Sequence, residues 1–155
     1  MPKYPVLAFD LGGTKLSSAL VDDGGTLRGR RSEPVDLCSP RAPIDQMIRL
    51  AGGRFSAVGV AVPGLIRRNG TVWAPNLPQW DRVPLARTLQ RELNVPVFVE
   101  SDRNAAVIGE SWRGVARGKS DVIVLIVGTG IGAGILSGGS VVRGAHELSG
   151  CAGWL

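Results

Sequence analysis

Residues 6–25 read VLAFDLGGTKLSSALVDDGG, the pattern of a β-hairpin followed by a second tight turn. The apolar runs Val6–Phe9 and Leu16–Val21 favour two strands, and Gly12-Gly13 favours the turn between them. Residues 122–139 read VIVLIVGTGIGAGILSGG and repeat the order of strand, glycine turn with threonine, strand and glycine turn. This internal repeat lies about one domain length further along the chain. It indicates a duplicated lobe, of which the chain contains only the beginning of the second copy.

Between the two hairpins, helix and strand patterns alternate. Apolar residues spaced by three and four positions predict helices, and short apolar runs that end at glycine or proline predict strands. The expected elements are a strand over 26–33, a helix around 43–51, a strand over 57–62, a helix around 85–93 capped by Asp81, a strand over 97–99 and a helix from about 105 to 115. The chain is therefore predicted to be an α/β protein.

The composition is that of a globular domain. The chain has 155 residues, of which 44% are hydrophobic and 20% charged, which suits one domain with a core and is short for two. No apolar run approaches the roughly 20 residues that span a bilayer. The first strand begins at Val6 with no signal-peptide pattern before it. We expect a cytoplasmic protein with no membrane partner.

The cysteines argue against a protein stabilised by disulfides or zinc, and the charge distribution argues against a nucleic-acid-binding protein. Cys38 and Cys151 lie far apart and His146 has no clustered partner, so we predict neither a disulfide framework nor a structural zinc site. The net charge of +5 is compatible with nucleic-acid binding. The arginines, however, are spread along the chain, and no aromatic residues alternate with them. We expect a solvated basic surface and no nucleic-acid partner.

The turn of the first hairpin is the first candidate phosphate site. Gly12 and Gly13 let backbone N–H groups approach an anion closely, because no Cβ is in the way. Thr14 adds a hydroxyl donor and Lys15 a positive charge, while Asp10 is placed to hold Mg²⁺ through water. The alternative is a plain hairpin with a polar tip, which this stretch alone does not exclude.

The glycine-rich turn of the second hairpin, residues 128–134, is the second candidate. It has the spacing of a dinucleotide fingerprint, but that fingerprint must open a helix. Here Ile135-Leu136 followed by further glycines predicts a strand and a turn. Neither turn is followed by the Gly-Lys-Ser/Thr of a P-loop. Two glycine hairpins from matching lobes would instead bind a triphosphate from both sides.

Five short motifs, in this order and spacing, resemble the ROK family of sugar kinases and regulators. They are FDLGGTK at residues 9–15, GVAVPG at 59–64, PNLPQW at 75–80, DRNAA at 102–106 and GTGIG at 128–132. They extend over nearly the whole chain, which resembles the N-terminal portion of a glucokinase-like member of the actin-like ATPase superfamily.

The resemblance implies two actin-like lobes of RNase H-like topology, each with a mixed sheet flanked by helices. Sugar and ATP would bind in the cleft between the lobes. Residues 1–118 would form the N-terminal lobe, and residues 119–155 would begin the second lobe with its first hairpin. The implied activity is the MgATP-dependent phosphorylation of a hexose or amino-hexose.

The family's functional residues carry over to matching positions. The implied phosphate-binding residues are Asp10, Gly12, Gly13, Thr14, Lys15, Gly128, Thr129 and Gly130, with Asp10 also near Mg²⁺; the implied sugar-binding residues are Gly64, Asn76, Ser101, Asp102 and Trp154. Asp102 resembles the catalytic base that takes the proton from the attacking sugar hydroxyl.

The chemistry of phosphoryl transfer supports the role of Asp102 independently. The reaction needs a carboxylate directed at the nucleophilic hydroxyl. Asp102 follows a predicted strand and opens a helix, so it lies at a strand's carboxyl end, where α/β proteins bind ligands. An aspartate in a first helical turn is also favoured by the helix dipole alone. Together with the other motifs, catalysis is the better interpretation.

The sequence departs from the family pattern at two places. The family usually has Asn before the catalytic aspartate, and this chain has Ser101. The family's Gly-Glu-x-Gly-His motif aligns with residues 150–154, where Cys151 and Trp154 replace the glutamate and histidine. In many members that histidine also helps to hold zinc, which an indole cannot do. The loss of a charged acceptor weakens the expected grip on sugar hydroxyls.

Three functions therefore remain open. The first is the sugar kinase, and the second is a sugar-sensing or vestigial domain without turnover, favoured by Cys151 and Trp154. The third is a metal-dependent nuclease with Asp10 and Asp102 as ligands, which rests on fold analogy and leaves the glycine turn 128–134 without a role. The strands at 121–137 would have unpaired edges, which allows pairing with another chain and thus a homodimer.

Overall fold

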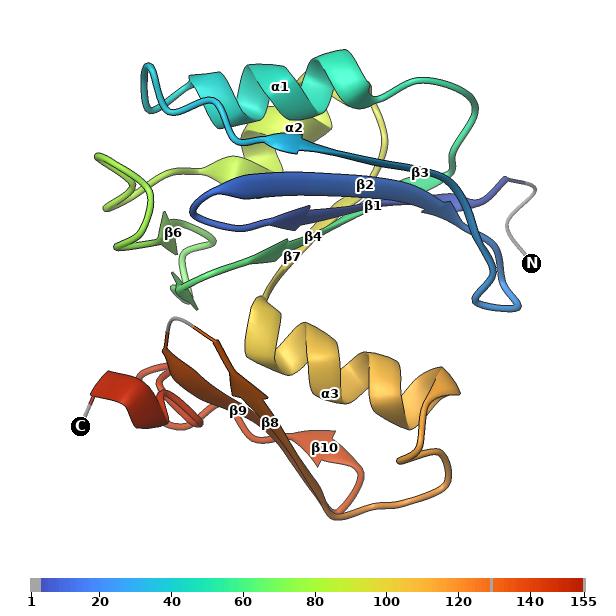
Figure 1. Ribbon diagram of the computed structural model, residues 1–155, viewed down its shortest axis with the longest axis vertical. Helices are drawn as coiled ribbons and strands as arrows, with labels where there is room; N and C mark the ends of the chain where they lie inside the picture. Colours follow the sequence, from blue (N-terminus) through green and yellow to red (C-terminus); the bar gives the residue numbers. More distant parts are fainter. Residues whose placement is uncertain (1–3, 129, 155) are drawn as a thin grey trace. The chain divides into compact units, whose positions relative to one another are not determined.

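The computed structural model describes residues 4–128 and 130–154, and for Trp154 only the backbone. The chain forms two compact units, Met1–Glu100 and Ser101–Leu155. The units are described separately, and Figure 1 shows the elements of each. This division places the helix after Ser101 in the second unit. The boundary predicted after Gly118 is that between the two lobes of a kinase, and it stays a prediction.

The first unit is built on a five-stranded sheet with the order β3-β2-β1-β4-β7. Its strands are β1 (Val6–Leu11), β2 (Lys15–Val21), β3 (Leu27–Pro34), β4 (Ala57–Val62) and β7 (Val97–Ser101). The first three form an antiparallel meander, whereas β4 runs parallel to β1, with Leu7 opposite Val58. The sheet is therefore mixed, as predicted.

Two helices, α1 (Ala42–Leu50) and α2 (Leu85–Leu93), cover one face of this sheet (Figure 1). Alternate residues of β1 and β4 point to this face, as the two-residue period of a strand requires. The core residues that meet there include Leu7, Phe9, Leu11, Val58, Val60, Val62, Met47, Leu85 and Leu89. The helices thus enclose the apolar face of the central strands.

The start of α2 corrects one expectation. Asp81 does not cap this helix: the N-cap residue is Pro84, and no side chain caps it. The Asp81 carboxylate instead accepts a hydrogen bond from Arg67 at 3.1 Å. Between β4 and α2 the chain forms a short hairpin of two strands, β5 (Leu65–Ile66) and β6 (Val72–Trp73). The sequence did not predict this hairpin, because strands of two residues have no detectable period.

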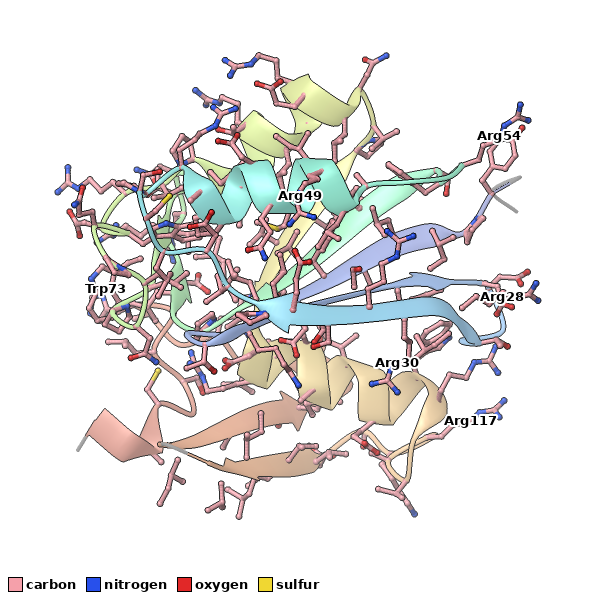
Figure 2. All side chains as sticks on the ribbon, turned by 45° about the horizontal axis from the view of Figure 1, so that its top comes forward. Arg28, Arg30, Arg49, Arg54, Trp73 and Arg117 are labelled. Carbon is pink, nitrogen blue, oxygen red and sulfur yellow. The ribbon has the colours of Figure 1, made fainter. Side chains whose placement is uncertain are left out.

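A buried glutamine joins α1 to the edge of the sheet. The Gln46 amide donates to the Glu33 carboxylate at 2.7 Å and to the Pro34 carbonyl at 2.8 Å, and its oxygen accepts from the Asp36 N–H. Arg49, which Figure 2 labels on α1, also binds Glu33, at 2.6 Å. Hydrogen bonds from Gln46 and Arg49 hold the pKa of Glu33 below its ordinary value.

The second unit has one helix and a small sheet. Its elements are α3 (Asp102–Arg113), β8 (Val122–Val127), β9 (Ile131–Ser137), β10 (Ser140–Val141) and a 3-10 turn, η1 (Ala152–Trp154), with the strand order β10-β9-β8. The predicted second hairpin is confirmed as β8–β9. The helix α3 begins at Asp102, the residue that was predicted to open it. No helix in the described ranges is long and apolar enough to cross a membrane.

Leu89 tests the core of the first unit, because it is fully buried on α2. Leu89→Ala leaves a cavity and is expected to lower the free energy of unfolding by about 2 to 5 kcal/mol. Leu27→Ala is the matched control, since Leu27 is 51% exposed and its truncation should cost less than about 1 kcal/mol. Urea denaturation followed by tryptophan fluorescence, to which the buried Trp80 contributes, measures both. Equal losses would contradict this description of the core.

Candidate functional site

The first glycine turn joins β1 to β2 at the end of the central strand. The Gly12 N–H donates to the Lys15 carbonyl at 2.8 Å, which closes the turn. The side chains of Asp10, Thr14 and Lys15 are exposed there. A carboxylate, a hydroxyl and an ammonium group are thus presented together beside backbone that carries no Cβ. This donor set suits a phosphate with an accompanying hydrated cation.

The candidate sugar residue Asn76 lies against this turn. A Cβ added to Gly13 would come 3.2 Å from the Asn76 Cβ and 3.4 Å from its carbonyl oxygen. Gly13 therefore lets the turn and the Asn76 segment approach each other closely. The structure brings together two stretches, one predicted to bind phosphate and one to bind sugar, that lie more than sixty residues apart in the sequence.

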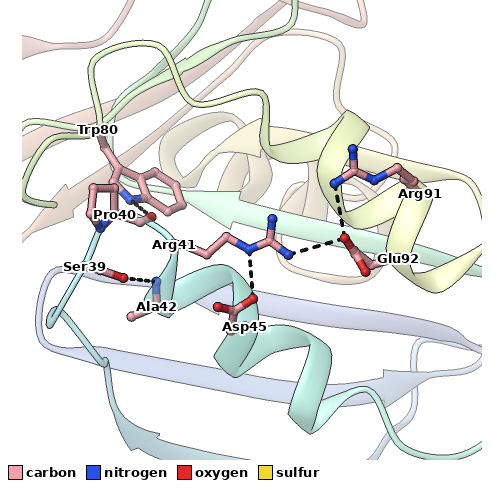
Figure 3. A network of polar contacts seen from close by, with 8 residues as sticks. All are labelled: Ser39, Pro40, Arg41, Ala42, Asp45, Trp80, Arg91 and Glu92. Carbon is pink, nitrogen blue, oxygen red and sulfur yellow. Dashed lines mark hydrogen bonds and ion pairs between the residues drawn. The ribbon is translucent and has the colours of Figure 1, made fainter.

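The exposed tip that carries Asn76 is held by two buried anchors, Leu77 and Trp80. The Ala74 N–H donates to the Trp80 carbonyl at 2.9 Å, and the Leu77 N–H donates to the Ala74 carbonyl at 3.0 Å. The indole N–H of Trp80 donates to the Pro40 carbonyl at 2.9 Å (Figure 3). The apolar residues of this motif thus fix the turn, and its polar residue faces solvent.

The loop that receives Trp80 is itself tied to both helices. Arg41 binds Asp45 of α1 at 2.9 Å and Glu92 of α2 at 3.3 Å, and Arg91 also binds Glu92 (Figure 3). Hydrogen bonds from Arg91 and Arg41 lower the pKa of Glu92. These pairs are half-exposed, so they orient the loop more than they stabilise the fold. Sequence patterns did not single out Arg41, because its link to α2 depends on Glu92, which lies 51 residues away in the chain.

Gly64 follows β4 in a conformation that favours glycine, with φ of +145°. A Cβ at this position would overlap the carbonyl oxygen of Trp73 on β6. The position therefore requires glycine for structural reasons. Its predicted contact with sugar stays a prediction.

In the second unit, Asp102 is the first residue of α3. Ser101 is its N-cap: the Ser101 hydroxyl is buried and accepts the Asn104 N–H at 3.3 Å. The Asp102 carboxylate accepts the Arg103 N–H at 2.8 Å, and the Arg103 guanidinium lies 3.8 Å away. The Asp102 side chain remains 41% exposed. A carboxylate that is oriented from one side and open on the other can accept a proton from a ligand.

The second glycine turn lies between β8 and β9. The Gly128 N–H donates to the Gly130 carbonyl at 2.9 Å; Thr129 lies outside the described residues. Further along β9, a Cβ at Gly134 would overlap the Arg103 carbonyl oxygen, and one at Gly132 would come 2.8 Å from the Arg103 Cδ. Because Gly132 and Gly134 have no Cβ, the first turn of α3, which carries Asp102, packs directly against β9.

The divergent segment 150–154 also lies along β9. Gly150 has φ of +77°, and the Ala133 N–H donates to its carbonyl at 2.7 Å. Burial raises the pKa of the Cys151 thiol; Arg103 opposes this effect and Asp102 adds to it. Cys151 is thus an electrostatic neighbour of Asp102. The Trp154 side chain lies outside the described residues, and its expected stacking on sugar stays a prediction.

The candidate residues divide between the two units: Asp10, Gly12, Gly13, Thr14, Lys15, Gly64 and Asn76 belong to the first, and Ser101, Asp102, Gly128, Gly130 and Cys151 to the second. Sequence reasoning missed Arg103, whose buried side chain links Asp102 to β9. Among residues 4–128 and 130–154, no three His, Cys, Asp or Glu side chains cluster as a metal site would require.

Comparison with known proteins gives a consistent picture. A model of the ROK family matches residues 6–155. A glucokinase from Thermotoga maritima is 36% identical, over 96% of this chain and 49% of the glucokinase. A xylose repressor from Caldicellulosiruptor bescii is 43% identical over 95 residues, which are 60% of this chain and 24% of the repressor.

A solved structure supports the same assignment. The crystal structure of a ROK family glucokinase from Streptomyces griseus in complex with glucose and AMPPNP has a TM-score of 0.85 and 30% identity. The match covers 95% of this chain and 49% of that chain. The predicted actin-like α/β fold is confirmed. The chain spans about half the length of the two glucokinases.

A substitution at Gly64 tests the close backbone contact between Gly64 and the Trp73 carbonyl. Gly64→Ala forces a Cβ into the Trp73 carbonyl and a strained φ, so we expect a loss of at least about 2 kcal/mol in the free energy of unfolding. Gly59→Ala on β4 is the matched control, since a Cβ there meets nothing within 4 Å and the change should stay within about 1 kcal/mol. Urea denaturation compares the two variants, and similar losses would contradict the described contact.

Proposed function

The chain belongs to the ROK family, and on that premise we propose that it serves the ATP-dependent phosphorylation of a hexose or amino-hexose. The observation that carries this proposal is the strand–glycine turn–strand hairpin present in each unit, with an exposed carboxylate, Asp102, at the start of α3. Turns without Cβ atoms suit phosphate oxygens, and an exposed carboxylate suits a hydroxyl nucleophile.

In the proposed reaction, Asp102 accepts the proton of the attacking sugar hydroxyl. The hydroxyl oxygen forms a bond to the γ-phosphorus while the bond from that phosphorus to the leaving ADP oxygen breaks. Backbone N–H groups of the two glycine turns, with Thr14 and Lys15, stabilise the charge on the phosphate oxygens. Gly64, Asn76, Ser101 and Trp154 are the proposed sugar-binding residues, with the Trp154 indole stacking on the sugar.

Mg²⁺ would neutralise phosphate charge when it is bound with ATP, and Asp10 is the residue proposed to hold it through water. The exposed Asp10 carboxylate beside the first glycine turn supports this role. Because ATP is a cytoplasmic substrate, we place the reaction in the cytoplasm. Sugar and ATP are the proposed partners, and a homodimer remains open.

A second candidate function is sugar sensing without turnover. It is favoured by Cys151 and Trp154, which replace charged and ligating residues of the family pattern, and by the similarity of 95 residues to a xylose repressor. A sensing domain needs sugar affinity but no general base. The two functions therefore differ in how they respond to changes at Asp102.

The role of Asp102 is tested in a chimera that joins residues 1–155 to the half of the Thermotoga maritima glucokinase that the match does not cover. We expect sugar-dependent ADP release with a panel of hexoses that includes glucose. Asp102→Asn should lower kcat by about 10²- to 10⁴-fold, since it removes the general base and leaves the size of the side chain unchanged. Asp45→Asn, on an exposed ion pair of α1, is the control and should leave kcat within about twofold.

Calorimetric titration of the same chimera separates the two functions. Sugar binding without ADP release, in both the unchanged chimera and Asp102→Asn, would support sensing and contradict the kinase. The absence of sugar and MgATP binding by a folded chimera would contradict both.

Cys151 and Trp154 give a further prediction in this chimera. Restoring the family pattern with the double change Cys151→Glu and Trp154→His supplies a charged acceptor for sugar hydroxyls. We expect it to lower KM for the sugar by about tenfold, the size of one charge-assisted hydrogen bond. KM for ATP should stay unchanged. A rise in KM for the sugar would show that the thiol and indole are adapted to a different sugar.

A further inference from the structure

The first unit contains a cavity of about 930 Å³ that none of the predicted site residues lines. Three stretches of chain surround it: the turn of the β5–β6 hairpin, the helix α2 and the loop that leads from α2 into β7. Small-molecule sites have volumes of about 300–1,000 Å³, so this cavity has room for a whole organic ligand. The chemistry of its walls indicates which kind of ligand fits.

The polar face of α2 forms one wall of the cavity. Its polar residues recur at the spacing of one helical face. They are Arg87, Gln90, Arg91 and the C-cap residue Asn94. The opposite face of the helix carries the core residues Leu85 and Leu89. The helix therefore separates the core of the unit from the cavity.

This wall is positively charged. Arg87 and Arg91 lie one helical turn apart, where like charges repel each other. Within residues 4–128 and 130–154, Arg87 forms no ion pair and the lining of the cavity includes no Asp or Glu. The negative end of the α2 dipole corresponds to about half an elementary charge, which is less than the charge of either arginine. An anion placed between the two guanidinium groups would relieve their repulsion.

Arg91 can bind such an anion without leaving a carboxylate unpaired. Its guanidinium contacts Glu92 at 3.2 Å, and Glu92 is also bound by Arg41 at 3.3 Å (Figure 3). Glu92 therefore keeps one partner when Arg91 binds a ligand instead. The exchange costs little, because ion pairs of exposed side chains are weak.

The turn of the β5–β6 hairpin offers a hydrogen-bond donor from another side. The Asn69 side-chain oxygen accepts the Thr71 N–H at 3.1 Å and the Thr71 hydroxyl at 2.8 Å. A backbone N–H can only donate, so these bonds identify the amide oxygen and occupy it. The NH₂ group of Asn69 is thus left to donate to a ligand.

The remaining wall is apolar and carries no aromatic ring in the described part of the chain. It consists of Pro84, Ala86, Val95 and Pro96. Such a surface suits the organic part of a ligand, but it offers no ring face on which a sugar could stack. A neutral sugar would also leave the charge of both arginines uncompensated.

We propose that this cavity binds a small organic phosphate. The phosphoryl oxygens accept hydrogen bonds from Arg87 and Arg91, whose planar guanidinium groups match the geometry of a phosphate, and from the Asn69 amide. The organic part lies on the apolar wall. None of these residues takes part in the proposed phosphorylation, so the inference does not depend on that reaction.

Titration of the chain followed by its amide NMR signals tests the site. The probes are phenyl phosphate, inorganic phosphate and glucose. We expect phenyl phosphate to shift the signals of Gly70, Thr71 and Val95 until the site is saturated. Inorganic phosphate should bind more weakly, because it lacks the organic part, and glucose should leave these signals unchanged. The signals of Gly12 and Gly13 report separately on the first glycine turn.

Arg87→Ala and, independently, Arg91→Ala should each raise the Kd of phenyl phosphate at this site at least about tenfold, since each removes a charge-assisted hydrogen bond. Arg30→Ala is the matched control. Arg30 is an exposed residue of β3 outside the cavity (Figure 2), so this variant loses the same charge, and its Kd should change less than about twofold. Circular dichroism checks that each variant is folded.

Three results would overturn the proposal. One is that phenyl phosphate leaves the signals of Gly70, Thr71 and Val95 unchanged, or shifts only those of Gly12 and Gly13. The second is an equal response to glucose, which would make the ligand a neutral one. The third is an equal loss of affinity in Arg30→Ala and Arg87→Ala, which would show attraction by net charge alone. Because the titration needs neither ATP nor turnover, an inactive chimera contradicts only the proposed function.

Discussion

The central strand β1 can be buried because β4 pairs with it in parallel while two helices cover its apolar face. A parallel partner cannot follow through a tight turn; it needs a crossover, and here the crossover contains β2, β3 and α1. The carboxyl ends of β1 and β4 therefore meet at the same edge of the sheet. That edge carries the first glycine turn and the segment that begins at Gly64, which is why polar groups from distant parts of the sequence gather there.

Close backbone approach is the second requirement of both units. Gly13 lies against Asn76, and Gly134 lies against the first turn of α3. In each case the absent Cβ brings a candidate functional segment within contact distance of a hairpin. The glycines of these motifs therefore have a packing role as well as a proposed phosphate-binding role, and the packing role is visible in the structure without any ligand.

Sequence patterns predicted the main strands and helices, because residues such as Leu85, Leu89 and Leu93 show the period of a buried helical face. These patterns did not predict the features that depend on contacts between residues distant in the sequence. Asp81 has the chemistry of a helix cap, but its carboxylate is used by Arg67. The cap of α3 was not predicted either: the buried Ser101 hydroxyl accepts the Asn104 N–H, and the predicted contact of Ser101 with sugar stays a prediction. Arg103 gave no signal, because its importance depends on the packing of α3 on β9.

The most consequential departure from the family pattern lies beside the proposed base. A glutamate at position 151 would put a second carboxylate in the electrostatic environment of Asp102 and Arg103. Cys151 has a raised pKa, with burial as the largest cause, so its thiol is neutral at neutral pH. Arg103 then acts on Asp102 without an opposing charge at residue 151. The substitution therefore does more than remove a contact with sugar: it also removes a negative charge from the surroundings of Asp102 and Arg103.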